Sequence, residues 1–408
     1  MTPYDNIIKQ LKKAASIMNL EKDILTILSS PERIITATLA LKMDNGSLKT
    51  FLAYRVQYSS ICGPYKGGLR FHPQVDLEEI KALALGMTIK TALVKIPLGG
   101  GKGGLVVDTK SLSKKEIERL SRTWVRAFQD VLGPQKDIPA PDLYTNPQIM
   151  SYMVDEYSKL SGREVKGVIT GKPLAYGGSK GRITATAQGA FYILEKALQD
   201  LGFQKELSVA IQGFGNAGGT IAKLLYDAGY KIVALADSQE ALYNKKGFNI
   251  DKVLKYKKEK KSLKGFNNSQ IIKAEELLTL NIDILIPAAL DNQINKDNVE
   301  KIKAKVILEL ANGPTTLEAE EILSKKGIII IPDVLANAGG VLVSYFEWLQ
   351  NLKDNYWSAT EVNNKLKEKI ISSWQTVYNI SKKHKTNLRT AAFIGALERI
   401  KTKFKLKS

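Results

Sequence analysis

The chain has 408 residues, of which 44% are hydrophobic and 25% are charged. This balance is typical of a globular protein with two or three domains, and no apolar run reaches the roughly 18 residues that span a bilayer. The formal net charge is +19, but the lysines are dispersed and match no nucleic-acid-binding motif. One cysteine and two histidines are too few for a cysteine- or histidine-rich metal site. We therefore expect no metal site and no nucleic-acid or membrane partner.

The N-terminal segment has apolar residues at the spacing of an amphipathic helix rather than of a signal peptide, which predicts a cytoplasmic protein. The spaced residues are Ile7, Ile8, Leu11, Ala14, Ala15 and Met18. Apolar residues then alternate over Arg33–Met43 and over Thr50–Ser59, on either side of the turn Asp44–Gly46. Two alternating runs around an Asn-Gly turn predict a β-hairpin.

The stretch Gly63–Gly104 concentrates lysine beside glycine. Lys66 precedes two glycines, Lys102 stands within a glycine run, and Lys90 ends a segment with helical spacing. Glycine lets a ligand approach the backbone, and a desolvated lysine offers a cation whose pKa falls readily. Glycine clusters also mark ordinary turns, and most lysines are solvated surface residues. Taken together, the three lysines suggest a pocket for a small molecule with more than one carboxylate.

The next segment combines helical patterns with two loops of special composition. Helical spacing covers Ser113–Leu132. Three prolines predict that Asp137–Met150 is a rigid loop, not a helix or a central strand, and this loop carries Asp142. Pro147 is expected to begin the following helix. The Gly- and Pro-rich stretch Gly171–Arg182 predicts a hinge or a domain boundary.

A dinucleotide-binding fingerprint opens the second half of the chain. Gly213-Phe214-Gly215-Asn216-Ala217-Gly218 fits G-x-G-x-x-G, directly after the apolar run Val209–Gln212 and before a segment with helical spacing. A second apolar run, Ile232–Ala236, ends at Asp237, about 20 positions further on. The glycines permit a tight turn and the close approach of a pyrophosphate, and the carboxylate would bind the ribose hydroxyls. This context predicts binding of NAD or NADP.

Three further apolar segments predict a continuing parallel sheet. They are Ile282–Pro287, Lys305–Glu309 and Ile328–Pro332, and the loops after them carry Ala288-Ala289, Asn312-Gly313-Pro314 and Asn337-Ala338-Gly339-Gly340. Loops at the carboxyl ends of parallel strands are where such sheets bind ligands. The expected fold class is α/β, with an α/β substrate-binding and oligomerisation domain over 1–180 and a Rossmann-type, doubly wound dinucleotide-binding domain over 181–340. Helical spacing over 341–408 predicts C-terminal helices that pack back on the first domain and complete it.

A nicotinamide cofactor together with a lysine-rich pocket that holds a carboxylate suits oxidation of an amino acid to an imine and its hydrolysis to an oxo acid. Over almost its whole length the chain resembles the glutamate dehydrogenases of the glutamate/leucine/phenylalanine/valine dehydrogenase family, most closely the archaeal type. The motifs that carry the resemblance are GPYKGGLRFHP (63–73), IPLGGGKGG (96–104), DIPAPD (137–142), GGSKGR (177–182), GFGNAG (213–218) and NAGGVLVSYFEW (337–348).

The resemblance implies roles for individual residues. Lys102 matches the lysine that activates water, and Asp142 matches the carboxylate that shuttles protons. Lys90 matches the residue that holds the substrate α-carboxylate, while Lys66 and Ser344 match the pair that binds the side-chain carboxylate. The remaining matches are Ala140 and Val341 in the pocket wall, and Thr186 and Asn312 near the nicotinamide and its ribose.

The activity implied by this resemblance is the reversible, NAD(P)-dependent oxidative deamination of L-glutamate to 2-oxoglutarate and ammonia. It also implies a homohexamer of two stacked trimers. Two alternatives stay open from the sequence. One is a dehydrogenase for a branched or aromatic amino acid, and the other is a catalytically silent regulatory subunit of the same fold.

The choice between NAD and NADP stays open as well. Asp237 favours NAD because a carboxylate repels a 2′-phosphate. Ser238 beside it could bond a phosphate, and Lys245 and Lys246 lie close in sequence. We expect NAD or dual use, and the lysine-rich stretch 252–264 receives no role. The candidate cofactor contacts are Thr186, Gly213, Phe214, Gly215, Asn216, Ala217, Gly218, Asp237, Ser238, Ala288, Ala289, Asn312 and Asn337.

Overall fold

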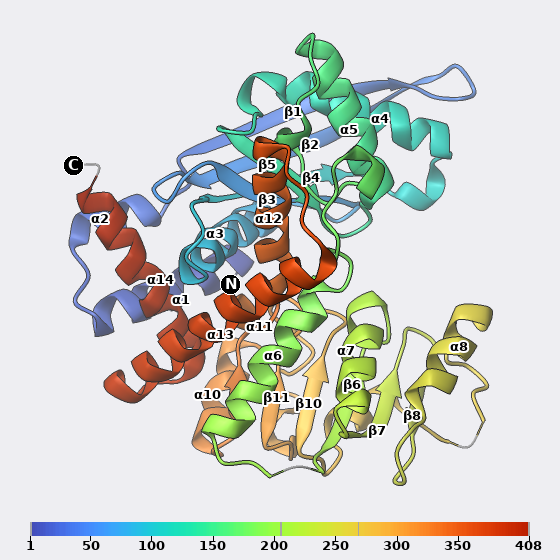
Figure 1. Cartoon of the computed structure of the whole chain (residues 1–408), viewed down its shortest axis with the longest axis vertical. Helices are drawn as coiled ribbons and strands as arrows, with labels where there is room; N and C mark the ends of the chain where they lie inside the picture. The colour runs from blue at the N-terminus through green and yellow to red at the C-terminus, as the bar shows by residue number, and fades with distance from the viewer. Residues whose placement is uncertain (1, 205, 268, 407–408) are drawn as a thin grey trace. The chain divides into compact units, whose positions relative to one another are not determined.

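The computed structural model describes residues 2–204, 206–267 and 269–406, and the chain divides into two compact units (Figure 1). Unit 1 comprises Met1–Arg182, Val341–Asn364 and Phe393–Ser408, and unit 2 comprises Ile183–Gly340 and Lys365–Ala392. The sequence-based division assigned all of 341–408 to the first domain, whereas the structure groups Lys365–Ala392 with unit 2. The outermost positions of the predicted first and last segments, 1 and 407–408, lie outside the described residues.

Unit 1 is built on a mixed five-stranded sheet with the order β1-β2-β4-β3-β5. Its strands are β1 (Arg33–Lys42), β2 (Leu48–Ser59), β3 (Tyr65–His72), β4 (Gly100–Val106) and β5 (Asp137–Pro141). Its helices are α1 (Pro3–Ile17), α2 (Lys22–Leu28), α3 (Leu77–Leu93), α4 (Lys114–Phe128) and α5 (Pro147–Leu160), with short 3-10 turns at Thr109–Ser111, Gln129–Val131, Lys166–Val168 and Leu174–Tyr176. Strands β1 and β2 pair antiparallel, which confirms the predicted hairpin.

The glycine clusters around Lys66 and Lys102 lie in strands rather than in turns. The Lys66 cluster lies in β3 and the Lys102 cluster lies in β4. The apolar pattern marks a strand only from Leu105, whereas β4 begins five residues earlier. Helix α3 packs directly on β4, and a Cβ at Gly100 would lie 2.0 Å from Thr88 Oγ1. Glycine is therefore required here by the close approach of a helix, and both lysines acquire fixed positions in the sheet.

The expectation of a loop over the whole of Asp137–Met150 is wrong for its first five residues. These residues form β5, which pairs parallel with β3 at the edge of the sheet. An edge strand tolerates proline because one side of it needs no ladder hydrogen bonds, and Pro139 and Pro141 lie opposite Gly67 and Leu69. Pro147 does begin the next helix, α5, as predicted.

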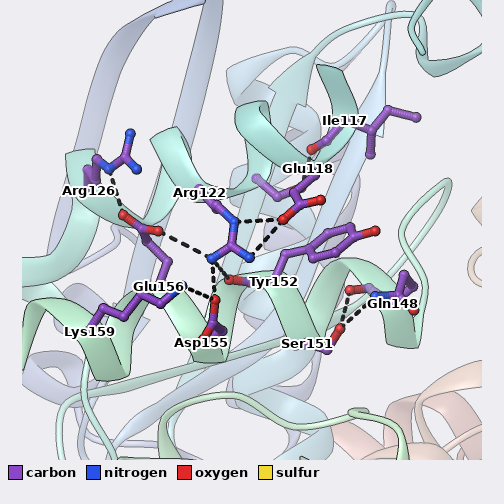
Figure 2. Close-up of polar contacts among 11 residues, drawn as sticks. Ile117, Glu118, Arg122, Arg126, Gln148, Ser151, Tyr152, Asp155, Glu156 and Lys159 are labelled. Carbon is purple, nitrogen blue, oxygen red and sulfur yellow. Dashed lines mark hydrogen bonds and ion pairs between the residues drawn. The ribbon is translucent and has the colours of Figure 1, made fainter. Parts of the chain in front are cut away.

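Helices α4 and α5 pack side by side against an apolar cluster of unit 1. That cluster includes Trp124 and Phe128 of α4 and Met150 of α5, all buried. On the outer side of the two helices, Figure 2 shows Arg122 of α4 donating to Glu118 and reaching Asp155 on α5. This network is half-exposed and holds the helix pair together at its surface, where ion pairs contribute little individually.

Unit 2 is built on a seven-stranded sheet with the order β12-β11-β10-β6-β7-β8-β9. Its strands are β6 (Ser208–Gln212), β7 (Lys231–Ala236), β8 (Ala241–Tyr243), β9 (Gln270–Ile272), β10 (Ile284–Pro287), β11 (Val306–Leu308) and β12 (Ile329–Ile331). Its helices are α6 (Ala185–Asp200), α7 (Asn216–Asp227), α8 (Ile250–Lys260), α9 (Ala274–Leu278), α10 (Leu317–Lys325) and α11 (Asp333–Ala336), with a 3-10 turn at Val299–Lys301. The predicted parallel strands are confirmed, whereas the short antiparallel strands β8 and β9 at the sheet edge have no counterpart in the prediction.

The strand order of unit 2 reverses beside β6, the first strand of this sheet in the chain. The chain passes from β6 to its neighbour β7 and later returns to β10 on the opposite side of β6. In a doubly wound sheet the crevice outside the carboxyl ends of the strands at this reversal is the usual place for a ligand. The Gly213–Gly218 loop follows β6 and Ala288 follows β10, so both predicted loops lie at this point.

The C-terminal segment is helical, as the sequence predicts. Its helices are α12 (Gly339–Lys353), α13 (Ala359–His384) and α14 (Leu388–Lys405). The predicted apolar positions Leu366, Ile370, Trp374 and Val377 of α13 are buried, and Trp374 Nε1 donates to Asp200 Oδ2 at 2.8 Å. No helix in the part of the chain that the structure describes is long and apolar enough to cross a membrane.

Candidate active site

Lys102 and Asp142 form a buried ion pair in unit 1. Lys102 lies in β4, Asp142 directly follows β5, and β3 runs between these two strands. Lys102 Nζ donates to Asp142 Oδ2, and the lysine side chain is 5% exposed. The two side chains meet across β3 at Gly68, where a Cβ would lie 2.8 Å from Asp142 Cβ and 2.9 Å from its Oδ2. The pair therefore depends on glycine at this position.

Arg70 shares the Asp142 carboxylate with Lys102. Its Nε donates to Asp142 Oδ1 at 2.9 Å, while its Nη1 donates to Glu79. Burial lowers the pKa of Lys102; Asp142 opposes this shift and Arg70 reinforces it. Burial raises the pKa of Asp142, but the charges of Lys102 and Arg70 outweigh it and hold that pKa below its usual range. The result is an ionised carboxylate beside a lysine that releases its proton more readily than an ordinary lysine.

Lys66 is a buried cation of β3. Its Nζ donates to the carbonyl oxygen of Ile138 at 3.1 Å, and it has no ion-pair partner among the described residues. Burial lowers the pKa of Lys66 well below its ordinary value, and the charges of Arg55 and Arg182 lower it further. The Arg55 charge is itself balanced, since its Nε donates to buried Asp137 at 2.9 Å. A buried cation without a counter-ion is costly, and an anionic ligand would relieve that cost.

The other residues predicted for the substrate lie in the same unit. Ser344 of α12 is buried, and its hydroxyl is 2.5 Å from that of Thr170. Ala140 is buried in β5, Val341 lies near the start of α12, and Lys90 lies half-buried in the last turn of α3. Unit 1 thus contains all seven predicted catalytic and substrate residues, and it brings Lys102 and Asp142 into direct contact.

Sequence reasoning missed two arginines that the structure places at this site. Arg70 lies in the GPYKGGLRFHP motif and Arg182 in the GGSKGR motif, but no role was assigned to either. Arg182 Nε is buried without a hydrogen-bond partner, and this side chain lowers the pKa of Lys66. The signal in the sequence was their position within motifs already singled out. The contact of Arg70 with Asp142 depends on the pairing of β3 with β5 and could not be found from the spacing alone.

The glycine loop of unit 2 has the geometry that a dinucleotide needs. Gly213 has φ +102°, which favours glycine, and a Cβ there would lie 2.8 Å from the backbone of Ala288. A Cβ at Gly218 would lie 1.8 Å from Gly213 O, so the helix packs tightly on the turn. Gly215 is exposed at the N-cap of α7, and nothing lies within 4 Å of its Cβ position. This open space beside helix N–H groups fits a pyrophosphate.

The remaining predicted loops of unit 2 are partly connected to one another. Asn337 Nδ2 donates to Asn312 Oδ1 at 2.9 Å, which joins the loops after β11 and β12. Ala288 follows β10 next to Gly213, and Thr186 lies in the first turn of α6. The other members are placed as follows: Phe214 is buried, Asn216 is exposed with its amide donating to Ile183 O at 3.3 Å, Ala217 is half-buried, and Ala289 is exposed.

Asp237 follows β7, as predicted, but its carboxylate is already engaged by the protein. Oδ1 accepts from the backbone N–H groups of Gln239 at 2.8 Å and Glu240 at 3.0 Å. Oδ2 accepts from the N–H of Leu263 at 2.7 Å and from Lys257 Nζ. Burial raises the pKa of Asp237, but these bonds outweigh it and lower the pKa below its ordinary value. The expected free carboxylate is therefore a paired one.

Ser238, Lys245 and Lys246, the other residues considered for a 2′-phosphate, are all exposed. Ser238 lies in the turn between β7 and β8, and the two lysines follow β8. Their exposure leaves their side chains accessible to a ligand. The structure adds Lys257 of α8 to this region, a residue from the lysine-rich stretch that the sequence left without a role.

Comparison with known proteins finds one family over most of the chain. The dimerisation domain of Glu/Leu/Phe/Val dehydrogenases matches residues 31–159, and the Glutamate/Leucine/Phenylalanine/Valine dehydrogenase domain matches residues 177–407. An NADP-specific glutamate dehydrogenase of Synechocystis is 47% identical over 96% of this chain and 94% of its own length. A catabolic NAD-specific glutamate dehydrogenase of Bacillus subtilis is 45% identical over 95% of this chain and 92% of its own.

A solved structure supports the same assignment. The crystal structure of a hetero-hexameric glutamate dehydrogenase from Thermus thermophilus, in a Leu-bound form, matches with a TM-score of 0.95 and 34% identity. The match covers 100% of this chain and 97% of that one. The similarity in sequence and in fold therefore extends over nearly the full length of these relatives. The chain belongs to the glutamate/leucine/phenylalanine/valine dehydrogenase family.

Proposed function

We propose that this protein is an NAD(P)-dependent glutamate dehydrogenase that reversibly deaminates L-glutamate to 2-oxoglutarate and ammonia. The observation that carries the proposal is the buried Lys102–Asp142 pair, which is held across Gly68 and shared with Arg70. The pair places a lysine of lowered pKa beside an ionised carboxylate. The reaction needs such groups to move protons to and from the substrate amine and the attacking water.

Each residue of the pair has a task in this reaction. The Gly213–Gly218 loop of unit 2 would hold the pyrophosphate of NAD or NADP, and the bound cofactor would supply a hydride acceptor. Lys102 Nζ, once deprotonated, takes the proton of the water that attacks the substrate imine. Asp142 exchanges protons with the substrate amine and with Lys102. Arg70 keeps the Asp142 carboxylate oriented by its bond to Oδ1.

Lys66 supports glutamate over a branched or aromatic amino acid as the substrate. A buried lysine with no carboxylate partner among the described residues suits a second substrate carboxylate, and an apolar side chain would leave this charge unbalanced. Arg182 and the hydroxyl pair of Ser344 and Thr170 offer further donors in the same unit. A site that bonds a polar group rejects analogues that lack it far more strongly than an apolar pocket rejects a size change.

We propose in addition that the chain assembles as a homohexamer and works in the cytoplasm. The solved relative from Thermus thermophilus is a hetero-hexamer. Light scattering on a sizing column would give a mass six times that of the chain if the assembly is correct. A monomeric or dimeric mass at the concentration used in assays would contradict it.

The reaction is tested by following reduced cofactor at 340 nm with 2-oxoglutarate, ammonia and NADH or NADPH, and with 4-methyl-2-oxopentanoate as the comparison substrate. Turnover of 2-oxoglutarate well above the comparison is the expected outcome. Lys66→Leu should lower kcat/KM for 2-oxoglutarate by about a hundredfold or more, the loss expected for one missing charged contact. The same substitution should lower kcat/KM for 4-methyl-2-oxopentanoate much less.

Two other outcomes would reject the proposal in different ways. Turnover of the apolar oxo acid alone would identify a dehydrogenase for branched amino acids. A folded protein that binds the dinucleotide but turns over neither substrate would identify a silent member of the family.

A further inference from the structure

The Asp237 carboxylate has no acceptor position left for a ligand. A carboxylate offers about four lone-pair sites. Here Gln239, Glu240 and Leu263 supply three backbone N–H donors, and Lys257 Nζ supplies a fourth. A ribose hydroxyl could bond this carboxylate only by displacing one of them. The usual assumption that an acidic residue at this position selects NAD by accepting from the 2′-hydroxyl does not describe this site.

The three backbone donors are held in place by the surrounding fold. The bonds from Gln239 and Glu240 belong to the turn between β7 and β8. Leu263 has a fully buried side chain, so its N–H cannot turn away from Asp237 without exposing that side chain. Gly265 N donates to Glu240 Oε2 at 3.1 Å, which ties the loop after α8 to the same turn. Lys257 is therefore the donor that a ligand can recruit.

Lys257 is also the more accessible member of the pair. Its side chain is 24% exposed, whereas that of Asp237 is 5% exposed. An approaching ligand would meet the ammonium group before the carboxylate. The surrounding stretch of chain is strongly basic, with one acidic residue, Glu259, among the lysines Lys252, Lys255, Lys257, Lys258, Lys260, Lys261 and Lys264.

We propose that Lys257 is the residue that sets the preference between NADP and NAD in this protein, by neutralising Asp237 and offering its ammonium group to a 2′-phosphate. This inference rests on the proposed function, since it assigns a cofactor preference to the same dinucleotide site. With the carboxylate paired, the charge that would repel a 2′-phosphate is cancelled. The site then accepts NADP despite its acidic residue at the end of β7. It also gives the lysine-rich segment a role.

The experiment compares two adenosine nucleotides that differ only in the 2′-phosphate. Titration calorimetry on the full chain would measure the affinities of 2′,5′-ADP and of 5′-AMP, and cofactor fluorescence would measure those of NADPH and NADH. Lys257→Met should weaken 2′,5′-ADP and NADPH by about tenfold or more, the loss of one charge-assisted contact. It should not weaken 5′-AMP or NADH, because removal of Lys257 leaves an acceptor position on Asp237 that the 2′-hydroxyl can use.

Two further variants separate charge from structure. Lys257→Arg keeps the charge and should keep the preference, while Lys258→Met removes an exposed neighbouring lysine of α8 and should change neither affinity by more than about twofold. Asp237→Asn removes the competing charge, and Lys257 then turns wholly to the ligand, so 2′,5′-ADP should bind more tightly. Lys257→Gln keeps a hydrogen-bond donor near Asp237 without the positive charge, so it tests the proposal even if Lys257→Met fails to fold.

Equal weakening of both nucleotides by Lys257→Met, or no change in either, would overturn the proposal. So would a parent protein that binds 5′-AMP but not 2′,5′-ADP. These binding measurements need no glutamate. A protein that discriminates the nucleotides through Lys257 but does not oxidise glutamate would therefore refute the proposed reaction and leave this inference standing.

Discussion

The two units bury opposite surpluses of charge. In unit 1, the buried Lys66 and the half-buried Arg182, whose Nε is buried, have no carboxylate ion-pair partner among the described residues. In unit 2, a single guanidinium, that of Arg389 on α14, faces three carboxylates. Its donors reach Glu309 at 2.6 Å, Glu320 at 2.6 Å and Asp333 at 2.8 Å, and all four side chains are largely buried.

The two surpluses are balanced in different ways. Around Arg389, burial raises the pKa of Glu309 to about 7, so that a proton can neutralise one of the three carboxylates near neutral pH. Asp333 Oδ2 in turn accepts from the Gly313 N–H at 2.9 Å, which fixes the loop that carries Asn312. Lys66 in unit 1 can also lose its proton. If it stays protonated, its buried charge is stabilised only by a nearby anion. The excess negative charge around Arg389 can thus be neutralised by a proton, whereas the excess positive charge at Lys66 and Arg182 indicates a ligand with a carboxylate.

The largest effect should come from removing the lysine at the centre of unit 1. Lys102→Ala deletes the residue that we propose takes the proton from water, so turnover of glutamate should fall by about a thousandfold or more. Asp142 keeps its bonds to Arg70 and to the Leu143 N–H, so the fold and NAD(P)H affinity should survive. Steady-state kinetics and cofactor fluorescence measure the two quantities.

The matched control for this change is Lys114→Ala, which removes an exposed lysine at the start of α4 and should leave turnover unchanged. Near-normal turnover in Lys102→Ala would refute the acid–base role. Loss of cofactor affinity together with turnover would instead indicate that Lys102 supports the fold.

The second prediction concerns the surplus of acids in unit 2. The folded-state pKa of Glu309 is about 7, above its ordinary value of 4.5. The folded protein therefore binds more protons than the unfolded chain between these values, and stability falls as pH rises through this window. The total loss is on the order of 3 kcal/mol. Glu309→Gln removes the titrating group, so its thermal midpoint should fall less between pH 5 and pH 8 than that of the parent.

Glu318→Gln, an exposed change on the neighbouring helix α10, serves as the control and should keep the parent's pH dependence. If Glu309→Gln and the parent lose the same stability over this range, Glu309 does not hold the proton.

The third and smallest effect is on the pH dependence of the reaction. Arg70 lowers the pKa of Lys102, so Arg70→Gln should raise that pKa and move the acidic limb of glutamate oxidation, where the rate rises as Lys102 loses its proton, to higher pH. Arg70→Lys keeps a positive charge near Asp142 and should restore most of the parent profile. A reduced rate in Arg70→Gln with an unmoved pH profile would mean that Arg70 acts only through the position of Asp142.

Much of this molecule could be predicted from local patterns. The hairpin, the dinucleotide loop and the C-terminal helix pattern follow from spacing and turn residues, because these features depend on neighbours in the chain. The motifs also identified Lys102 and Asp142 as candidates. The contact between them could not be predicted from local patterns, because the residues are 40 positions apart and meet across a third strand at Gly68.

The sequence by itself thus determined the α/β class, the family and the residue types of both binding regions, since composition, periodicity and short motifs are written along the chain. The tertiary structure decided which charges are paired. The fold places β5 beside β3, although the prolines of β5 favour a loop. An edge strand tolerates proline because one of its sides forms no hydrogen bonds with a neighbouring strand. The tertiary structure also paired Asp237 with Lys257, 20 positions away along the chain, because the fold brings α8 to the end of β7. Charge pairing depends on distances in space, and spacing along a chain does not fix those distances.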